Sequence, residues 1–204
     1  MRNRAVLIAL VATLPLILLT AWSFSQMLPR LSDPCYHWGD SQPVVRVISP
    51  DSPCQSVEGT FQTKFQATLQ LLLINGGILI AGALGILGAS LGKPALTVLG
   101  AGLMFLESVP LIFSFAWLTV FVSGMLLLAA RAIAPLHGAA KFGARLLGSL
   151  AALAAVVYVP GLLYGAPMFL VFLLLALAFV ATIGWWPIRP SGFWGLGNGP
   201  HVSA

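Results

Sequence analysis

One carboxylate is the first candidate for chemistry in this sequence, because it stands alone in a long apolar segment. Glu107 is the only charged residue between Lys93 and Arg131. Carboxylates in such segments often bind protons or ions, since burying an unpaired charge in lipid is costly. The structural alternative is that Glu107 lies at a turn in the headgroup region, where water solvates it. The following Ser108-Val109-Pro110 disfavours helix and supports this second interpretation.

Amide side chains form a second candidate group. Gln62, Gln66 and Gln70 recur every four residues, so they share one face of a helix. Gln66, Gln70, Asn75 and Glu107 could together line a polar vestibule at the outer end of a transport path. The alternative is that Gln62 and Gln66 lie in water above the membrane. Gln70 and Asn75 would then hydrogen-bond to a neighbouring helix.

The two cysteines of the chain, Cys35 and Cys54, lie in its one substantial polar segment. Thiols that face an oxidising compartment usually pair. In the chain-entropy model, closing this loop contributes about 3 kcal/mol to stability. The alternative is a redox-active pair, but membrane thiol oxidoreductases generally use a close Cys-x-x-Cys pair or a second pair of cysteines. Neither occurs here, so we predict a structural disulfide.

Other catalytic and metal-binding patterns are missing from the sequence. His37, His137 and His201 are far apart, and the topology proposed below separates His37 from the other two. The sequence has no phosphate-binding glycine loop and no His-Glu-x-x-His motif. Ser123-Gly124 has no histidine in an expected membrane helix to act as its base. We therefore expect a non-catalytic protein, and the sequence names no cofactor or metal.

The composition indicates that most of the chain lies in lipid. Of its 204 residues, 59% are hydrophobic and 7% are charged, whereas a soluble domain carries roughly a quarter charged residues. The net charge is +5, but the cations are scattered singly. Nucleic-acid binding would require a basic stripe or patch, so we expect no nucleic-acid partner.

The apolar segments predict an all-α polytopic membrane protein: a bundle of six transmembrane helices with one disulfide-bridged extracytoplasmic loop. Residues 94–131 are too long for one crossing of about 20 residues, so we expect two helices that reverse near Pro110. A similar reversal is expected between Pro160 and Pro167. The alternative, four crossings, would require two helices of about 50 Å or more. The expected helices cover residues 5–28, 62–91, 94–109, 111–131, 144–160 and 167–186.

The same segments set the expected domain organisation. Residues 1–186 form a single transmembrane domain, with the outer loop at 29–61 and a Pro/Gly-rich cytoplasmic tail at 187–204. Residues 1–23 resemble a signal peptide in having a basic start and an apolar centre. The apolar segment is long for a signal core, which favours a retained helix over cleavage.

Small residues recur along the second expected helix and predict its packing surface. Spacing of about four residues places them on one face, where they let two membrane helices approach closely. The predicted packing residues are Gly77, Ala81, Gly85, Gly88, Ala89 and Gly92.

The distribution of cations predicts the orientation, because Lys and Arg concentrate in cytoplasmic loops. Six crossings place seven of the ten cations on one side: Arg2, Arg4, Lys93, Arg131, Lys141, Arg145 and Arg189. The other three, Arg30, Arg46 and Lys64, fall on the side of the cysteine loop. We therefore expect both termini in the cytoplasm of a bacterial-type plasma (inner) membrane, with the cysteine loop outside.

Abundant packing surface without a convergent set of catalytic groups favours one function. We expect a non-catalytic accessory or scaffolding subunit, with membrane lipids and other integral membrane subunits as partners. The alternative is a small permease or channel component that uses the polar vestibule. A thiol-redox role is the third hypothesis.

The disulfide gives the first testable prediction. Cys35 and Cys54 should stay oxidised in living cells, because a structural bond facing an oxidising space has no partner that reduces it. Non-reducing electrophoresis after alkylation of free thiols measures this. A pair that cycles between oxidised and reduced forms would instead support the thiol-redox hypothesis.

Overall fold

The computed structural model describes residues 2–31, 64–111, 116–165 and 167–186, and within these ranges the chain is helical. The helices are α1 (Arg2–Leu31), α2 (Lys64–Ser90), α3 (Pro94–Leu106), α4 (Ala116–Ile133), α5 (Gly138–Leu163) and α6 (Met168–Trp185). All except α3 are long and apolar enough to cross a membrane. The all-helical class is confirmed for this part of the chain, which is a membrane protein whose helices contact lipid.

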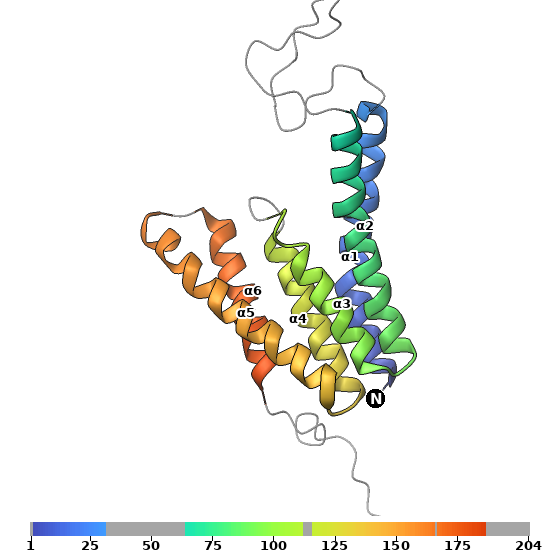
Figure 1. The fold of residues 1–204 in the computed structure, drawn as a ribbon, viewed down its shortest axis with the longest axis vertical. Helices are drawn as coiled ribbons and strands as arrows, with labels where there is room; N and C mark the ends of the chain where they lie inside the picture. The colour runs from blue at the N-terminus through green and yellow to red at the C-terminus, as the bar shows by residue number, and fades with distance from the viewer. Residues whose placement is uncertain (1, 32–63, 112–115, 166, 187–204) are drawn as a thin grey trace, which may run out of the picture.

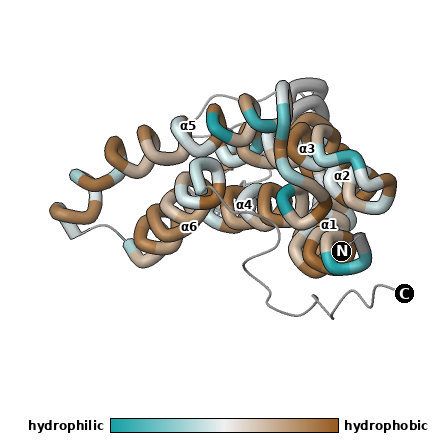
Figure 2. Tube along the Cα trace, turned by 90° about the horizontal axis from the view of Figure 1, so that it is seen from below, coloured by the Kyte–Doolittle hydropathy of each residue, from teal (hydrophilic) through white to brown (hydrophobic). Residues whose placement is uncertain are grey.

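Successive helices run in alternating directions (Figure 1). The start of α1, the α2–α3 and α4–α5 connections and the end of α6 lie at one end of the bundle. The end of α3, the start of α4, the end of α5 and the start of α6 point the other way. Viewed along the bundle, α4 lies in the middle, with α1 to α3 on one side and α5 and α6 on the other (Figure 2). In agreement, α4 packs against α1, α2, α3 and α6.

The turn between α2 and α3 is the one that Gly92-Lys93-Pro94 predicts. Gly92 has a φ of +68°, a left-handed conformation that glycine adopts without a steric cost. Its N–H donates to the carbonyl of Ala89 at 3.2 Å, and the N–H of Lys93 donates to that of Gly88 at 2.8 Å. This pattern is a Schellman motif, and Pro94 then starts α3 at a position where its missing N–H costs nothing.

The central reversal occurs where Glu107 and Pro110 predict it. Helix α3 ends at Leu106, residues 107–111 form turns, and α4 begins at Ala116. The helix ends differ from the expected bounds, because α3 ends before residue 109 and α4 starts after residue 111. With 13 residues, α3 is about 20 Å long, shorter than the roughly 30 Å apolar core of a bilayer.

The last hairpin reverses between Pro160 and Pro167 as predicted, but its first helix is longer than expected at both ends. Helix α5 starts at Gly138 instead of residue 144, so Lys141 belongs to the helix and not to the connection before it. Pro135 lies between α4 and α5 and interrupts the helix, and the alanines that follow it favour a new helix. Pro160 lies inside α5, and the reversal follows at Tyr164 and Gly165 (φ +78°). Neighbouring groups in membrane helices tolerate such a proline.

Close approaches of backbone hold the bundle together. A Cβ atom built on Gly100 of α3 would lie 2.7 Å from the backbone N of Gly85 and 2.8 Å from the backbone O of Ala81, both on α2. A Cβ on Gly184 of α6 would lie 2.7 Å from the Cα of Gly148 on α5. Any side chain at these positions would therefore force two helices apart.

Replacement of Gly100 tests this packing. Gly100→Ala should lower the free energy of unfolding in detergent by about 1–3 kcal/mol, because its Cβ meets backbone that cannot move aside. Gly102→Ala is the matched control on the same helix, since its Cβ would come no closer than 3.9 Å to Leu147. The control should be neutral or slightly stabilising, and equal losses in the two variants would contradict the proposed packing.

Candidate functional site

The Glu107 carboxyl group lies against α2 at Gly77. A Cβ atom built on Gly77 would overlap Oε1 of Glu107 and lie 2.5 Å from its carboxyl carbon. The carboxyl group thus fills the space that any larger residue at position 77 would occupy. Glu107 is partly buried, and the neighbouring Ser108 donates a hydrogen bond from Oγ to the carbonyl of Phe105 at 2.6 Å. Glu107 is therefore part of the α2–α3 contact and does not extend away from the protein.

The depth of Glu107 follows from the α1–α2 contact. A Cβ on Gly82 would touch Ile17 at 3.4 Å and Thr13 at 3.8 Å. Gly77 is five residues before Gly82 in α2, about 7.5 Å. Because α2 runs antiparallel to α1, Glu107 lies at about the level of residue 20 of α1. Trp22 of α1 is 62% exposed, and such tryptophans gather at the membrane interface. This geometry suits a carboxylate near the headgroup region, as the turn predicts.

The predicted vestibule residues do not all share one face. Gln66 and Gln70 are 11 and 7 residues before Gly77, so each position lies about 20° from Gly77 around α2, on either side of it. Asn75 is two positions away from Gly77, about 200° around the helix, and is partly buried. The structure thus brings Glu107 to the face that carries Gln66 and Gln70 but not to the face of Asn75.

The predicted packing residues occupy the contact with α3, with one exception. Ala81 and Ala89 are fully buried, and a Cβ on Gly88 would lie 2.5 Å from the backbone N of Thr97. A Cβ on Gly85 would lie 2.6 Å from the side chain of Leu126 of α4. Gly92 differs, because nothing lies within 4 Å of the Cβ built on it. Its function is the turn described above, which replaces the packing role that the spacing suggested.

A second polar site lies at the opposite end of the bundle, where Arg131 of α4 meets the end of α6. Its Nη2 donates to the carbonyl of Gly184 at 3.1 Å, and its Nη1 donates to the carbonyl of Trp186. Carbonyl groups at a helix C-terminus lack helical partners and carry partial negative charge. Arg131 therefore caps α6 and ties it to α4.

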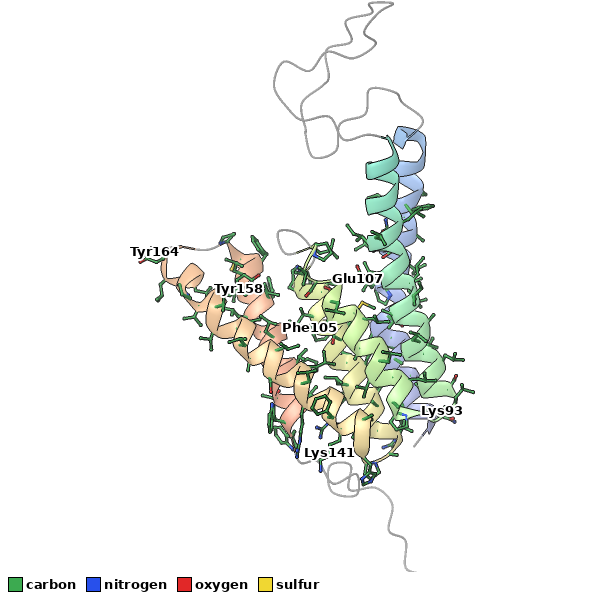
Figure 3. The ribbon with its side chains drawn as sticks, in the orientation of Figure 1. Lys93, Phe105, Glu107, Lys141, Tyr158 and Tyr164 are labelled. Carbon is green, nitrogen blue, oxygen red and sulfur yellow. The ribbon has the colours of Figure 1, made fainter. Side chains whose placement is uncertain are left out.

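Arg145, Trp185 and Ser149 complete this site. The guanidinium carbon of Arg145 lies 5.5 Å from the ring centroid of Trp185, a cation–π arrangement. Trp185 also donates from Nε1 to Oγ of Ser149 at 3.3 Å. We call the set of Arg131, Lys141, Arg145, Ser149 and Trp185 the arginine–tryptophan site. Figure 3 shows Lys93 and Lys141 at this end, far from Glu107 and Tyr164.

A buried hydrogen bond between two helices was not foreseen from the sequence. Ser123 of α4 is fully buried and donates from Oγ to the carbonyl of Ala101 of α3 at 2.7 Å. The only sequence signal for this hydrogen bond is a serine next to a glycine in an apolar segment. Because Gly124 allows the Phe179 ring to approach on the α6 side, the Ser123-Gly124 pair serves contacts in two directions.

Several predicted groups lie outside the described residues, namely Cys35, Cys54, His37 and His201. His137 is described and stands at the start of α5 without a capping hydrogen bond from its side chain. Among the described residues, no three of His, Cys, Asp and Glu lie close enough to hold a metal ion.

Comparison with known proteins gives no match to a family model, a curated protein or a solved structure.

The Arg131 cap predicts a specific loss of stability. Arg131→Gln should lower the free energy of unfolding in detergent by about 2 kcal/mol, because hydrogen bonds from a charged donor to two α6 carbonyls are lost. Arg131→Lys should recover only part of this, since an ammonium group cannot reproduce the planar fork. Arg4→Gln removes an exposed cation at the same end and should have little effect. An equal loss in Arg4→Gln would show that net charge, not the cap, sets stability.

Proposed function

We propose that this protein is a non-catalytic accessory or scaffolding subunit that packs against other integral membrane proteins in a larger complex. The observation that supports this most directly is the surface of α5. This helix packs through a narrow strip of small and apolar residues, Ala140, Ala144, Leu147, Gly148 and Ala151. Large apolar side chains cover its outer face, including Leu153 and Val157, which are 63% and 66% exposed. Such a face can receive either lipid or another membrane helix.

The α1–α2 pair supports the same proposal. These helices have 30 and 27 residues, about 45 and 40 Å, which exceeds the roughly 30 Å apolar core of a bilayer. Figure 1 shows the pair extending well past the ends of the other helices. A paired projection of this kind presents surface outside the membrane to a partner subunit.

The buried polar groups also favour a packing role. Among the described residues, the fully buried polar side chains carry hydroxyl groups, and each hydroxyl donates to a backbone carbonyl: Thr13 to Ala9, Thr20 to Leu16, Thr97 to Lys93, Thr119 to Ala116 and Ser123 to Ala101. The first four bonds stay within one helix and the Ser123 bond joins α4 to α3, so the donor of each hydroxyl is already used.

The proposed topology has six crossings, with both termini in the cytoplasm of a bacterial-type plasma membrane and the loop of Cys35 and Cys54 outside. It is supported by the alternating helix directions (Figure 1) and by the asymmetry of the cations. The short α3 fits this topology if its turn lies just inside the outer headgroup region, near the level of Trp22.

A small permease or channel component is the second candidate. The observation that favours it is the Glu107 carboxyl group on Gly77, on the face of α2 that also carries the Gln66 and Gln70 positions. A partly buried carboxylate in an apolar bundle is a candidate group on an ion path.

Gentle detergent extraction from the native membrane separates the two candidates. The subunit proposal predicts a defined larger assembly of fixed stoichiometry. Leu153→Ala with Val157→Ala should reduce that assembly by about tenfold, a change equivalent to about 1.4 kcal/mol. Leu7→Ala with Val11→Ala is the matched control, because these residues are similarly exposed, have the same four-residue spacing and lie at the end of α1 away from the projection; this variant should leave the assembly intact.

The Glu107→Gln, Gln70→Leu double variant tests the permease alternative in the same experiment. The subunit proposal predicts an unchanged assembly in this variant. A purified monomer or homo-oligomer that moves protons or ions into liposomes, and stops doing so in the double variant, would overturn the subunit proposal in favour of the permease.

A further inference from the structure

The arginine–tryptophan site concentrates positive charge on one small surface. Lys141 and Arg145 are four residues apart on α5, so they lie one above the other on the same face, and both are exposed. Arg131 and Arg145 both contact the end of α6, Arg131 through the carbonyls of Gly184 and Trp186 and Arg145 through the ring of Trp185, so their like charges lie near each other. The first turn of α5 adds the partial positive charge of a helix N-terminus, and the His137 side chain does not cap it.

No negative group of the described chain balances this charge. Glu107 is the sole acidic residue among the described residues, and it lies at the other end of the bundle (Figure 3). The partners that the arginines do have are uncharged: two α6 carbonyls for Arg131 and the face of an indole ring for Arg145. Three cations at one end of the bundle, beside a low-dielectric membrane, attract an anion from elsewhere.

The position of the site identifies the source of that anion. Lys141 and Arg145 lie in the first two turns of α5, and Trp185 and Trp186 lie at the last turn of α6 and just beyond it, both more than half exposed. Tryptophans at helix ends lie at the headgroup level, where lipid phosphates are held at high local concentration. Basic groups between membrane helices at this level are known to receive anionic headgroups.

We propose that the arginine–tryptophan site binds the headgroup phosphate of an anionic phospholipid in the leaflet at this end of the bundle. Lys141 and Arg145 contact the phosphate oxygens from α5. Trp185 fixes Arg145 through its ring and is itself oriented by its hydrogen bond to Ser149. Arg131, which is hydrogen-bonded to the end of α6, adds positive charge to the site. The lipid would thus bridge the α5 and α6 ends, a role that stands whether or not the protein is a subunit of a complex.

Native mass spectrometry of the delipidated full-length protein tests this site. The probes are dioleoylphosphatidylglycerol and dioleoylphosphatidylcholine, which share acyl chains and differ in net charge. The native protein should bind the first lipid at least tenfold more tightly than the second. Lys141→Gln with Arg145→Gln should weaken binding of phosphatidylglycerol by about 25-fold, at about fivefold for each cation near the surface.

The matched control removes two other cations from the same end of the bundle. Arg4→Gln with Lys93→Gln gives the same net charge, so it should change binding of phosphatidylglycerol less than about twofold if the site is local. Equal loss in the two double variants would overturn the proposal, because it would show a diffuse surface potential. Equal affinity of the native protein for the two lipids would overturn it as well.

Two further measurements keep the test decisive. In nanodiscs, phosphatidylglycerol should raise the melting temperature of the native protein above its value in phosphatidylcholine, and the Arg145→Gln single variant should lose most of this difference. Inorganic phosphate at millimolar concentration should not reproduce it. Full stabilisation by inorganic phosphate would show a soluble-anion site and overturn the lipid assignment.

Discussion

The close approach of helix backbones at small residues is the constraint on which the rest of this structure depends. Between membrane helices, burial of a leucine gains little, because lipid chains are as apolar as the leucine they replace. Association then rests on van der Waals contact and on hydrogen bonds between helices. The Gly85–Gly100 and Gly148–Gly184 contacts bring backbone against backbone, and the Ser123 hydroxyl adds a hydrogen bond between α4 and α3 at 2.7 Å.

Both polar sites are consequences of these contacts. At one end, the missing side chain of Gly77 leaves the space that the Glu107 carboxyl group fills. At the other, the approach of Gly148 to Gly184 brings Ser149, the next residue of α5, within hydrogen-bonding distance of Trp185. The glycines that pack the helices therefore also set where the few charged and polar groups of the membrane region come together.

The sequence was sufficient where a local signal decides the conformation. Gly92 and Pro94 determine a turn by their own backbone preferences, and the charge and proline near position 107 predict the central reversal. It was insufficient where a distant group decides. The residues between Pro160 and Pro167 predict the reversal, but they place the end of the helix at residue 160, whereas membrane surroundings allow α5 to continue through Pro160 to Leu163. The partners of Arg131 and Ser123 are 53 to 55 and 22 residues away, and no periodicity reveals a contact at such a separation.

The length of α3 and the position of Glu107 explain each other. With 13 residues, α3 is about 10 Å shorter than a full apolar core. Without neighbouring helices, the turn after α3 would therefore expose unpaired backbone groups to lipid. Irregular backbone at that depth is tolerated only beside protein or water. The contact of Glu107 with Gly77 places the turn beside α2. The Glu107 carboxylate, less than one helical turn below the level of Trp22, can also hydrate the turn. If α3 were two turns longer, its turn would need neither the contact with α2 nor water. Glu107 would then lie past Gly77 and outside the α2–α3 contact.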